Sequence, residues 1–386
     1  MKRLIYSLFF LCCITQINAQ GIKGNVKIGL LTSLYLDSAF DQKGNYRLQK
    51  NFPKQAVSGL EFYEGASLAI DSLNKFGYLA TMKVFDLQST EGNLEKLAAS
   101  GELSQYNLLI AHTGATEYLQ LAALSNEKNI PLINANYPND GGIRKSPTVF
   151  IANPKINSHL NVMHNQLIKK WPDANIIWFK RNDPGDERLA AIFKELSVSS
   201  NKIKYKTVEL NSSFSTDEIS IHLDTNKTNV LIAGSLDELF SSQFAKAILN
   251  YTKKGIIQVI GMPNWETLKE IQSKSYSGVP IYYTSGFFTS QGNKWIQEID
   301  EKFKENTGTK ASISAIRGYE LTFFFGSLWS KYKTLDMTKA QDSSLRIITD
   351  YDFRPVMWNA GAGLPDYFEN KRIYFIRRLN GITSLQ

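Results

Sequence analysis

Short apolar runs alternate with longer amphipathic segments along most of this chain, and this alternation constrains the fold more than any other feature of the sequence. Between residues 26 and 134 the pattern predicts four strands, with an amphipathic helix after each of the first three. The predicted strands are Val26–Thr32, Thr81–Leu87, Leu108–Ala111 and Pro131–Asn134, and the helices are Gln55–Phe76, Asn93–Leu103 and Glu117–Lys128. Strands that alternate with helices in this way pair in parallel, and the crossover helices cover both faces of the sheet.

The same alternation begins again after Val149, so we expect two copies of one α/β architecture. The second set comprises helices at Leu160–Lys170, Asp186–Leu196 and Ser241–Thr252, and strands at Asn175–Lys180, Lys204–Leu210, Val230–Ala233 and Ile257–Gly261. An extended segment, Ile281–Phe287, then precedes two more predicted helices, Lys294–Asn306 and Ile316–Lys333. A length of 386 residues is typical of two domains, each large enough to bury a core of its own.

The first 19 residues have the pattern of a secretory signal peptide. Lys2 and Arg3 precede an apolar run from Leu4 to Ile14, which is too short to span a bilayer. We predict cleavage after Ala19, and therefore a periplasmic or secreted protein. Both cysteines of the chain, Cys12 and Cys13, lie inside this segment, so the mature protein would carry no disulfide or thiolate metal site. A lipid anchor at either cysteine is the alternative, although Leu11 is not the small residue that normally precedes a lipidated cysteine.

The charge of the chain argues against nucleic acid as a partner. The formal net charge is +8, but the basic residues occur as scattered pairs such as Lys169-Lys170 and Arg377-Arg378. Nucleic-acid binding requires a clustered basic face, which this pattern lacks.

The sequence offers no motif for catalysis, and we predict that the protein is not an enzyme. It has no G-x-S-x-G, G-x-x-x-x-G-K-[ST] or G-x-G-x-x-G motif. His159 and His164 are five residues apart, so on a helix they do not form the i,i+4 pair of a zinc site. We therefore expect no catalytic residue, no metal site and no cofactor.

Loops after the predicted strands are where a ligand would bind, because parallel sheets collect ligands at the carboxyl ends of their strands. His112-Thr113-Gly114-Ala115-Thr116-Glu117 leads directly into a helix, with Thr113 or Thr116 as its N-cap. Free N–H groups there can bind an anion such as a carboxylate, although a plain capped helix start explains the same residues.

Three further loops follow strands in the same way. Asn136 and Tyr137 come after the fourth strand, Asp237 and Glu238 after Val230–Ala233, and Trp265 after Ile257–Gly261. Either acid can meet an ammonium group or simply favour the first turn of a helix, and either aromatic ring can cover an apolar side chain.

Over residues 26–333 the chain resembles the type I periplasmic solute-binding proteins, the group that includes leucine/isoleucine/valine-binding proteins and amino-acid receptor ligand-binding regions. The resemblance is carried by the strand KIGLL, the helix at residues 59–77, the HTGATE loop with its helix into NIPLINAN, and Arg317-Gly318-Tyr319-Glu320 at the start of a late helix. It implies two Rossmann-like lobes joined by three hinge crossovers, with a small ligand held between lobes that close on it. By position, residues 26–148 plus 288–338 would form the first lobe, and residues 149–287 plus 339–386 the second.

The resemblance also implies roles for the loop residues. Thr113 and the backbone of Gly114, Ala115 and Thr116 would bind a ligand carboxylate, and Asn136 and Tyr137 would flank it. Glu238 would pair with an ammonium group. The implied function is capture of a small, amino-acid-like ligand for an ABC importer, with a membrane permease complex as partner. The alternatives are a sensor or cell-envelope receptor without transport, and an enzyme that uses the cleft.

Overall fold

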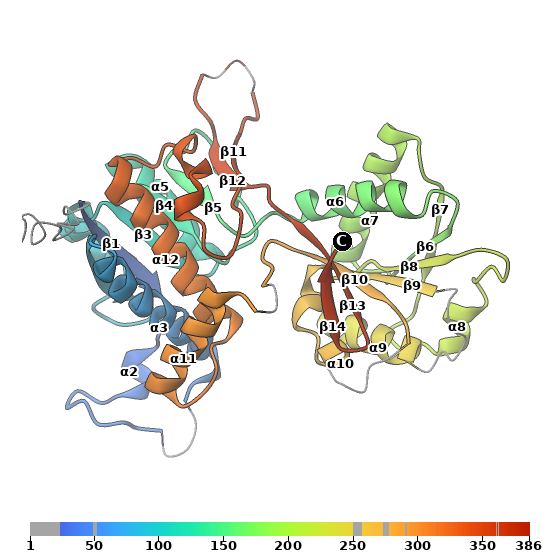
Figure 1. The fold of residues 1–386 in the computed structure, drawn as a ribbon, viewed down its shortest axis with the longest axis horizontal. Helices are drawn as coiled ribbons and strands as arrows, with labels where there is room; N and C mark the ends of the chain where they lie inside the picture. The colour runs from blue at the N-terminus through green and yellow to red at the C-terminus, as the bar shows by residue number, and fades with distance from the viewer. Residues whose placement is uncertain are drawn as a thin grey trace, which may run out of the picture. The chain divides into compact units, whose positions relative to one another are not determined.

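The computed structural model describes residues 24–48, 52–249, 257–272, 278–289, 292–359, 361 and 363–386. The predicted signal peptide, residues 1–19 with Cys12 and Cys13, lies outside the described residues. Two seven-stranded sheets flanked by helices make up the described chain, which confirms the predicted α/β fold (Figure 1).

The first sheet contains the strands of the first half of the chain and one hairpin from its end. Its strand order is β11-β12-β5-β4-β3-β1-β2. The pairs β1–β2, β1–β3 and β5–β12 are parallel, and β11–β12 is antiparallel. The strands are β1 (Asn25–Thr32), β2 (Leu79–Asp86), β3 (Leu108–His112), β4 (Leu132–Asn134), β5 (Val149–Ile151), β11 (Phe353–Val356) and β12 (Tyr367–Asn370).

The second sheet has the order β14-β13-β10-β9-β8-β6-β7. Its β6–β7, β6–β8, β8–β9 and β9–β10 pairs are parallel, whereas β10–β13 and β13–β14 are antiparallel. The strands are β6 (Asn175–Lys180), β7 (Tyr205–Glu209), β8 (Asn229–Ala233), β9 (Ile257–Gly261), β10 (Ile281–Ser285), β13 (Tyr374–Leu379) and β14 (Ile382–Leu385). The parallel pairing expected for the alternating part of the chain is thus present, and the C-terminal strands, which were not predicted, add antiparallel pairs.

The helices follow the predicted pattern closely up to residue 333. They are α2 (Leu36–Ala39), α3 (Lys54–Lys75), α4 (Leu94–Ser100), α5 (Ala115–Lys128), α6 (Ile156–Lys170), α7 (Pro184–Ser200), α8 (Thr216–Ser220), α9 (Glu238–Leu249), α10 (Lys269–Gln272), α11 (Lys294–Thr307) and α12 (Ile313–Tyr332). Local chemistry fixes several of their ends. The side chain of Asp183 accepts the Gly185 N–H at the start of α7, and Asn201 ends that helix in the left-handed conformation.

Helices α3 and α12 pack with their backbones unusually close together (Figure 1). A methyl group added at Gly65 would lie 1.8 Å from the carbonyl oxygen of Ala315, and one added at Gly318 would lie 2.1 Å from that of Phe62. Any side chain larger than hydrogen at these two positions would push the helices apart. The two glycines therefore fix how closely the N-terminal halves of α3 and α12 approach each other.

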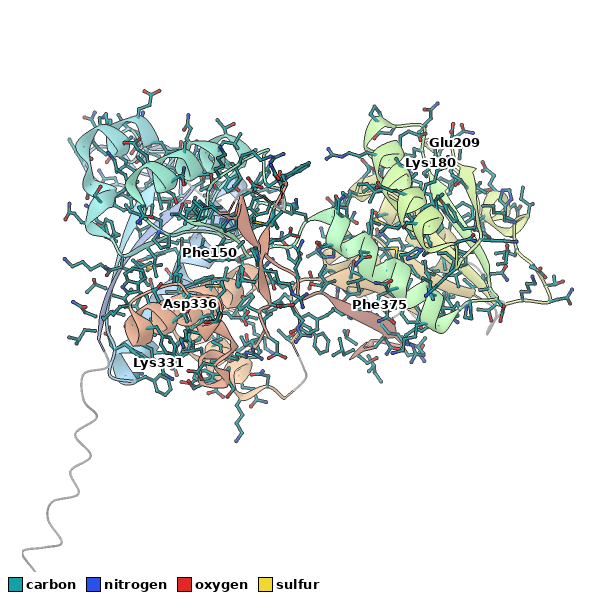
Figure 2. The ribbon with its side chains drawn as sticks, turned by 90° about the horizontal axis from the view of Figure 1, so that it is seen from above. Phe150, Lys180, Glu209, Lys331, Asp336 and Phe375 are labelled. Carbon is teal, nitrogen blue, oxygen red and sulfur yellow. The ribbon has the colours of Figure 1, made fainter. Side chains whose placement is uncertain are left out.

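Each sheet has its own aromatic core. In the first, Phe150 on β5 stacks on Phe368 at a centroid distance of 5.0 Å. In the second, Phe375 on β13 stacks on Tyr282 at 5.4 Å. Figure 2 labels Phe150 and Phe375 in their separate sheets. Both contacts join an early strand to a C-terminal one, so the final hairpins are integral to each core.

The chain passes between the two sheets three times, as the resemblance implies. The connections follow β5, β10 and β12, because each of these strands is succeeded by elements of the other sheet. The predicted lobe boundaries remain a prediction. The division of strands between the sheets and the division of the chain into two compact units fall at different residues, with residues 113–126 and 133–151 grouped with the second unit.

Candidate functional site

The first predicted binding loop lies between β3 and α5. Thr113 is buried, and its backbone N–H donates a hydrogen bond to Asn136 Oδ1 at 2.9 Å. Gly114 holds the position before the helix, where its carbonyl oxygen accepts the Tyr118 N–H at 3.1 Å. Neither threonine proposed as the N-cap takes that place, because the Thr113 hydroxyl donates to the Gly114 carbonyl oxygen and Thr116 lies inside the first turn.

The start of α5 already has a negative charge beside it. A methyl group added at Gly114 would lie 3.1 Å from Oε2 of Glu117, so this carboxylate lies close to the first turn. The position is favourable for Glu117, because a helix N-terminus attracts an anion. Gly114, Ala115 and Thr116 are exposed, but a ligand carboxylate brought to their N–H groups would be repelled by Glu117.

The loop after β4 is held in place by side-chain amides. Asn134 accepts the Tyr137 N–H at 3.0 Å and donates to the Tyr137 carbonyl oxygen at 2.8 Å. Asn153 donates to the Asn136 carbonyl oxygen at 2.9 Å. The Tyr137 ring packs on that of Tyr118, with centroids 5.3 Å apart. The structure thus joins Thr113, Asn136 and Tyr137 in one rigid polar loop cluster, and their roles toward a ligand stay a prediction.

The sequence did not single out His112, which ends β3 immediately before this loop. Its ring stacks on Phe62 at 4.8 Å, and its Nε2 lies 3.3 Å from Ser58 Oγ. Burial, with a smaller contribution from the nearby Arg317 guanidinium, lowers the pKa of His112 to about 4. The imidazole is therefore neutral at neutral pH, and it presents polar nitrogens at the carboxyl end of the first sheet.

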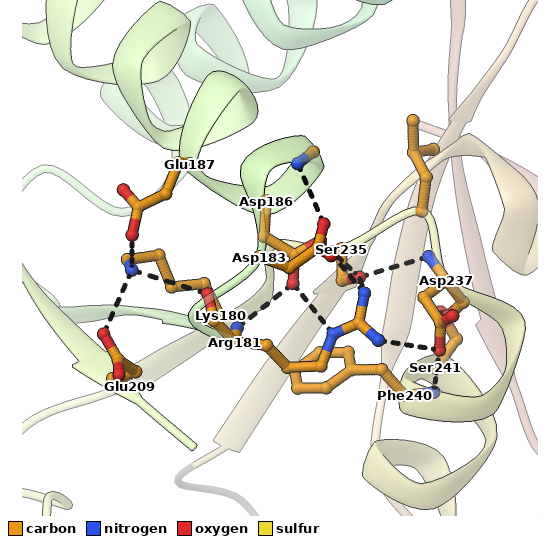
Figure 3. Close-up of polar contacts among 12 residues, drawn as sticks. Lys180, Arg181, Asp183, Asp186, Glu187, Glu209, Ser235, Asp237, Phe240 and Ser241 are labelled. Carbon is orange, nitrogen blue, oxygen red and sulfur yellow. Dashed lines mark hydrogen bonds and ion pairs between the residues drawn. The ribbon is translucent and has the colours of Figure 1, made fainter. Parts of the chain in front are cut away.

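The second sheet carries a polar cluster centred on Arg181, which directly follows β6 (Figure 3). Its Nε donates to Asp186 Oδ2 at 3.1 Å, and its guanidinium also contacts Ser235 Oγ at 3.3 Å and Asp237 Oδ1 at 3.3 Å. Asp186 is 2% exposed and also accepts the Ser235 hydroxyl at 2.7 Å. The hydrogen bonds that Arg181 donates to Asp186 raise the pKa of Arg181, and Phe240 lies beneath the guanidinium at 5.7 Å.

Only Asp237 of this cluster was predicted from the sequence, and Arg181, Asp186 and Ser235 were missed although signals for them were present. Arg181 comes directly after a buried strand, and Ser235 and Asp237 come shortly after another. Their partnership could not be foreseen, since Arg181 and Ser235 are 54 residues apart. With two carboxylates around one guanidinium, the cluster carries a net negative charge, and it is better suited to a cationic or hydroxyl group than to a ligand acid.

Three site residues were predicted in the second half of the chain, and the structure places each of them differently. Asp237 caps α9, because its Oδ1 accepts the Phe240 N–H at 2.7 Å. Glu238, the first residue of that helix, is exposed, and no ion pair joins it to another described residue. Trp265 is 0% exposed and packs beneath Gly261, where an added methyl group would lie 2.1 Å from its ring. Its proposed contact with a ligand stays a prediction, and the position is that of a core residue.

Two of the three connections between the sheets are tied together by buried ionic groups. Lys155, in the first connection, donates to Asp140 Oδ2 at 2.7 Å and also contacts the hydroxyl of Tyr367 on β12. Tyr367 in turn donates to Asp140 Oδ2 at 2.6 Å. Burial would raise the pKa of Asp140, but these hydrogen bonds lower it to about 2.

A second buried ionic group is centred on Glu369, two residues after Tyr367 on β12. Glu369 is 0% exposed, and its carboxylate accepts the Lys155 N–H at 3.1 Å, the Ser158 hydroxyl at 2.8 Å and the Lys371 ammonium at 2.7 Å. A buried carboxylate is tolerated because each oxygen has a charged or N–H donor. The two groups make the first and third connections a single polar assembly.

Across the described ranges, no group of three or more His, Cys, Asp or Glu side chains is arranged to hold a metal ion. None of the helices within those ranges combines the length and apolar character needed to cross a bilayer.

Comparison with known proteins gives likeness in structure but none in sequence. No protein-family model and no curated protein matches the chain. Among solved structures, a putative branched-chain amino acid ABC transporter protein from Rhodospirillum rubrum aligns with a TM-score of 0.66 at 11% identity, covering 94% of this chain and 100% of its own. An ABC transporter substrate-binding protein from Desulfitobacterium hafniense in complex with Leu aligns with a TM-score of 0.57 at 14% identity, covering 94% and 100%.

A third structure extends the range of ligands. A solute-binding protein from R. palustris in complex with benzoate aligns with a TM-score of 0.54 at 15% identity, covering 94% of this chain and 95% of its own. Each likeness spans nearly the whole of both chains, so it covers both sheets. The chain therefore has the periplasmic-binding-protein-like I fold, which is the fold of these ABC transporter substrate-binding proteins.

Proposed function

We propose that this chain is an exported solute-binding protein that captures a small polar ligand, amino-acid-like in character, and delivers it to an ABC importer. The observation that carries the proposal is the likeness over 94% of the chain to substrate-binding proteins, including ones solved with Leu and with benzoate. Two polar clusters at the carboxyl ends of the two sheets support it, because such ends are where parallel sheets bind ligands.

The proposed mechanism is closure of two lobes on the ligand. A ligand that contacts both lobes binds the closed state better than the open one and shifts the population toward it. A micromolar ligand supplies about 8 kcal/mol of binding free energy, which is enough to bias an opening equilibrium of a few kcal/mol. An importer that recognises the closed state would then distinguish the loaded protein from the empty one.

The test begins with the purified mature protein. Small molecules released by denaturation are identified by mass spectrometry, and each is returned to the ligand-free protein in a calorimetric titration. We expect saturable binding of at least one released compound without chemical turnover, together with a change in the solution scattering profile. Turnover of the compound, or scattering profiles that coincide with and without bound compound, would contradict this function.

A further inference from the structure

Arg317 is a partly buried cation at the start of α12, close to the candidate loops of the first sheet. It lies on the second turn of α12 and is partly buried, and no described carboxylate forms an ion pair or hydrogen bond with it. Arg181 differs, because Asp186 and Asp237 both contact its guanidinium. A guanidinium that no described carboxylate neutralises keeps its donors available, so it is a candidate partner for an anionic ligand.

Polar uncharged groups surround the same place. His112 Nε2 lies 3.3 Å from Ser58 Oγ, and Ser58 Oγ lies 2.9 Å from Ser314 Oγ. Ser314 is on α12, three residues before Arg317, and therefore on the same side of that helix. The nearest acid along α3, Glu61, is already bonded to the Ser312 hydroxyl at 2.7 Å. The cluster of His112, Ser58, Ser314 and Arg317 thus has a net charge of about +1 at neutral pH, since the imidazole is neutral.

The backbone holds this cluster in a fixed geometry. The close approach of α3 and α12 at Gly65 and Gly318 sets the separation of Ser58 and Ser314. A methyl group added at Gly59 would lie 2.5 Å from the carbonyl oxygen of Ser33, so α3 is also pressed against the carboxyl end of β1. Thr32, the last residue of β1, pairs with His112 in the sheet. These groups therefore lie at the sheet end where a ligand is expected.

We propose that Arg317, together with the hydroxyls of Ser58 and Ser314 and the imidazole of His112, recognises the carboxylate of the ligand. The proposal rests on the proposed solute-binding function, and it moves the acid-binding role away from the start of α5. There the Thr113 N–H is already bonded to Asn136, and Glu117 already occupies the helix end. A guanidinium matches a carboxylate with two parallel N–H donors, which neither a hydroxyl nor a lone backbone amide provides.

The experiment uses matched pairs of acids and their amides. L-leucine with L-leucinamide, benzoate with benzamide, and every compound released from the purified protein with its amide are titrated against the wild type, Arg317→Gln and Arg317→Lys. Arg188→Gln is the control, because Arg188 is exposed on α7 and its substitution makes the same change in charge. Melting temperature and circular dichroism check that each variant is folded.

We expect an acid to bind the wild type about 10- to 100-fold more tightly than its amide, as the loss of a charge-assisted hydrogen bond predicts. Arg317→Gln should weaken binding of the acid by a similar factor and leave binding of the amide nearly unchanged. Arg317→Lys should restore part of the affinity, and Arg188→Gln should match the wild type.

Three results would overturn the assignment. An acid that binds Arg317→Gln as tightly as the wild type, or an amide that binds as tightly as its acid, removes Arg317 from this role while the solute-binding function stands. A released ligand without any carboxylate has the same consequence. If no compound is released and none of the probes binds, the proposed function fails, and this inference fails with it.

Discussion

The pKa of His112 can be tested directly, and it reports on the environment at the end of β3. The folded protein holds this pKa at about 4, against an ordinary value of 6.5, chiefly because the ring is buried and secondarily because Arg317 is near. Each unit of difference corresponds to about 1.4 kcal/mol, so protonation of this one ring opposes folding by about 3 kcal/mol at low pH.

The sign of the effect follows from which state binds the proton. Between pH 4 and pH 6.5 the unfolded chain has a protonated His112 and the folded chain does not. The free energy of unfolding therefore rises with pH across this window and falls as the solution is acidified, with a contribution from His112 of about 1.2 kcal/mol per pH unit near the middle. Below pH 4 both states are protonated, and this contribution becomes flat.

The assay compares denaturant unfolding of the wild type and His112→Gln at several pH values within this window. The difference between their slopes isolates His112, because the other titrating groups are common to both proteins. His222→Gln is the matched control, since burial and Lys206 also lower the pKa of His222 but that ring is packed less deeply. Equal slopes for the wild type and His112→Gln, or a His112 NMR resonance that titrates near 6.5, would refute the reasoning.

Three further predictions concern the fold, a connecting segment and the ligand. Gly65→Ala should lower the free energy of unfolding by about 3 kcal/mol or more, measured by denaturant titration, because the new methyl group would lie 1.8 Å from the carbonyl oxygen of Ala315. Lys155→Met should lower the free energy of unfolding by about 2–3 kcal/mol and raise the pKa of Asp140 from about 2, which NMR titration of the carboxyl group would measure. Glu238→Gln should weaken the binding of ligands that carry an ammonium group by about 1.5–3 kcal/mol, measured by calorimetry, and leave the binding of neutral ligands unaffected.

Each of these has a comparison that can count against it. For Gly65→Ala the control is Gly361→Ala, where the nearest atom, Asn359 Oδ1, is 3.5 Å from the added methyl group, and where a change within about 0.5 kcal/mol is expected. Equal losses for the two variants would argue against close helix packing. If the pKa of Asp140 is unchanged in Lys155→Met, the ion pair between Lys155 and Asp140 does not stabilise the carboxylate. Equal weakening of charged and neutral ligands would remove the role of Glu238.

Much of the fold was predictable from hydrophobic periodicity up to residue 333. Central strands such as β3 (LLIAH) and β8 (NVLIA) are short and mostly apolar, and this pattern identifies strands buried on both faces. Periodicity failed for β12 (Tyr367–Asn370), because two of its four residues are the buried polar residues Glu369 and Asn370. Their burial is offset by donors such as Ser158, which lies 211 residues away and cannot be identified from local sequence.

The candidate site was also predictable only in part. The position of the loop at Thr113 was predictable, because a strand followed by a glycine-containing turn and a helix is a local pattern. The hydrogen-bond acceptor of the Thr113 N–H was not predictable, because Asn136 lies 23 residues further along the chain. Arg317 was noted only as part of a motif, and its lack of an ionic partner became visible only when α12 was placed against α3.

The return of the chain to its first sheet at β12 affects when the protein can fold as it is synthesised. Asn370 donates to the carbonyl oxygen of Ala152, 218 residues earlier, and β12 then extends that sheet beyond β5. The first sheet stays incomplete until β12 has emerged from the ribosome, and the second sheet waits for β13 and β14. Contacts so distant in sequence slow folding, so a nascent chain of this kind should remain incompletely folded, and accessible to chaperones, until these C-terminal strands have been synthesised.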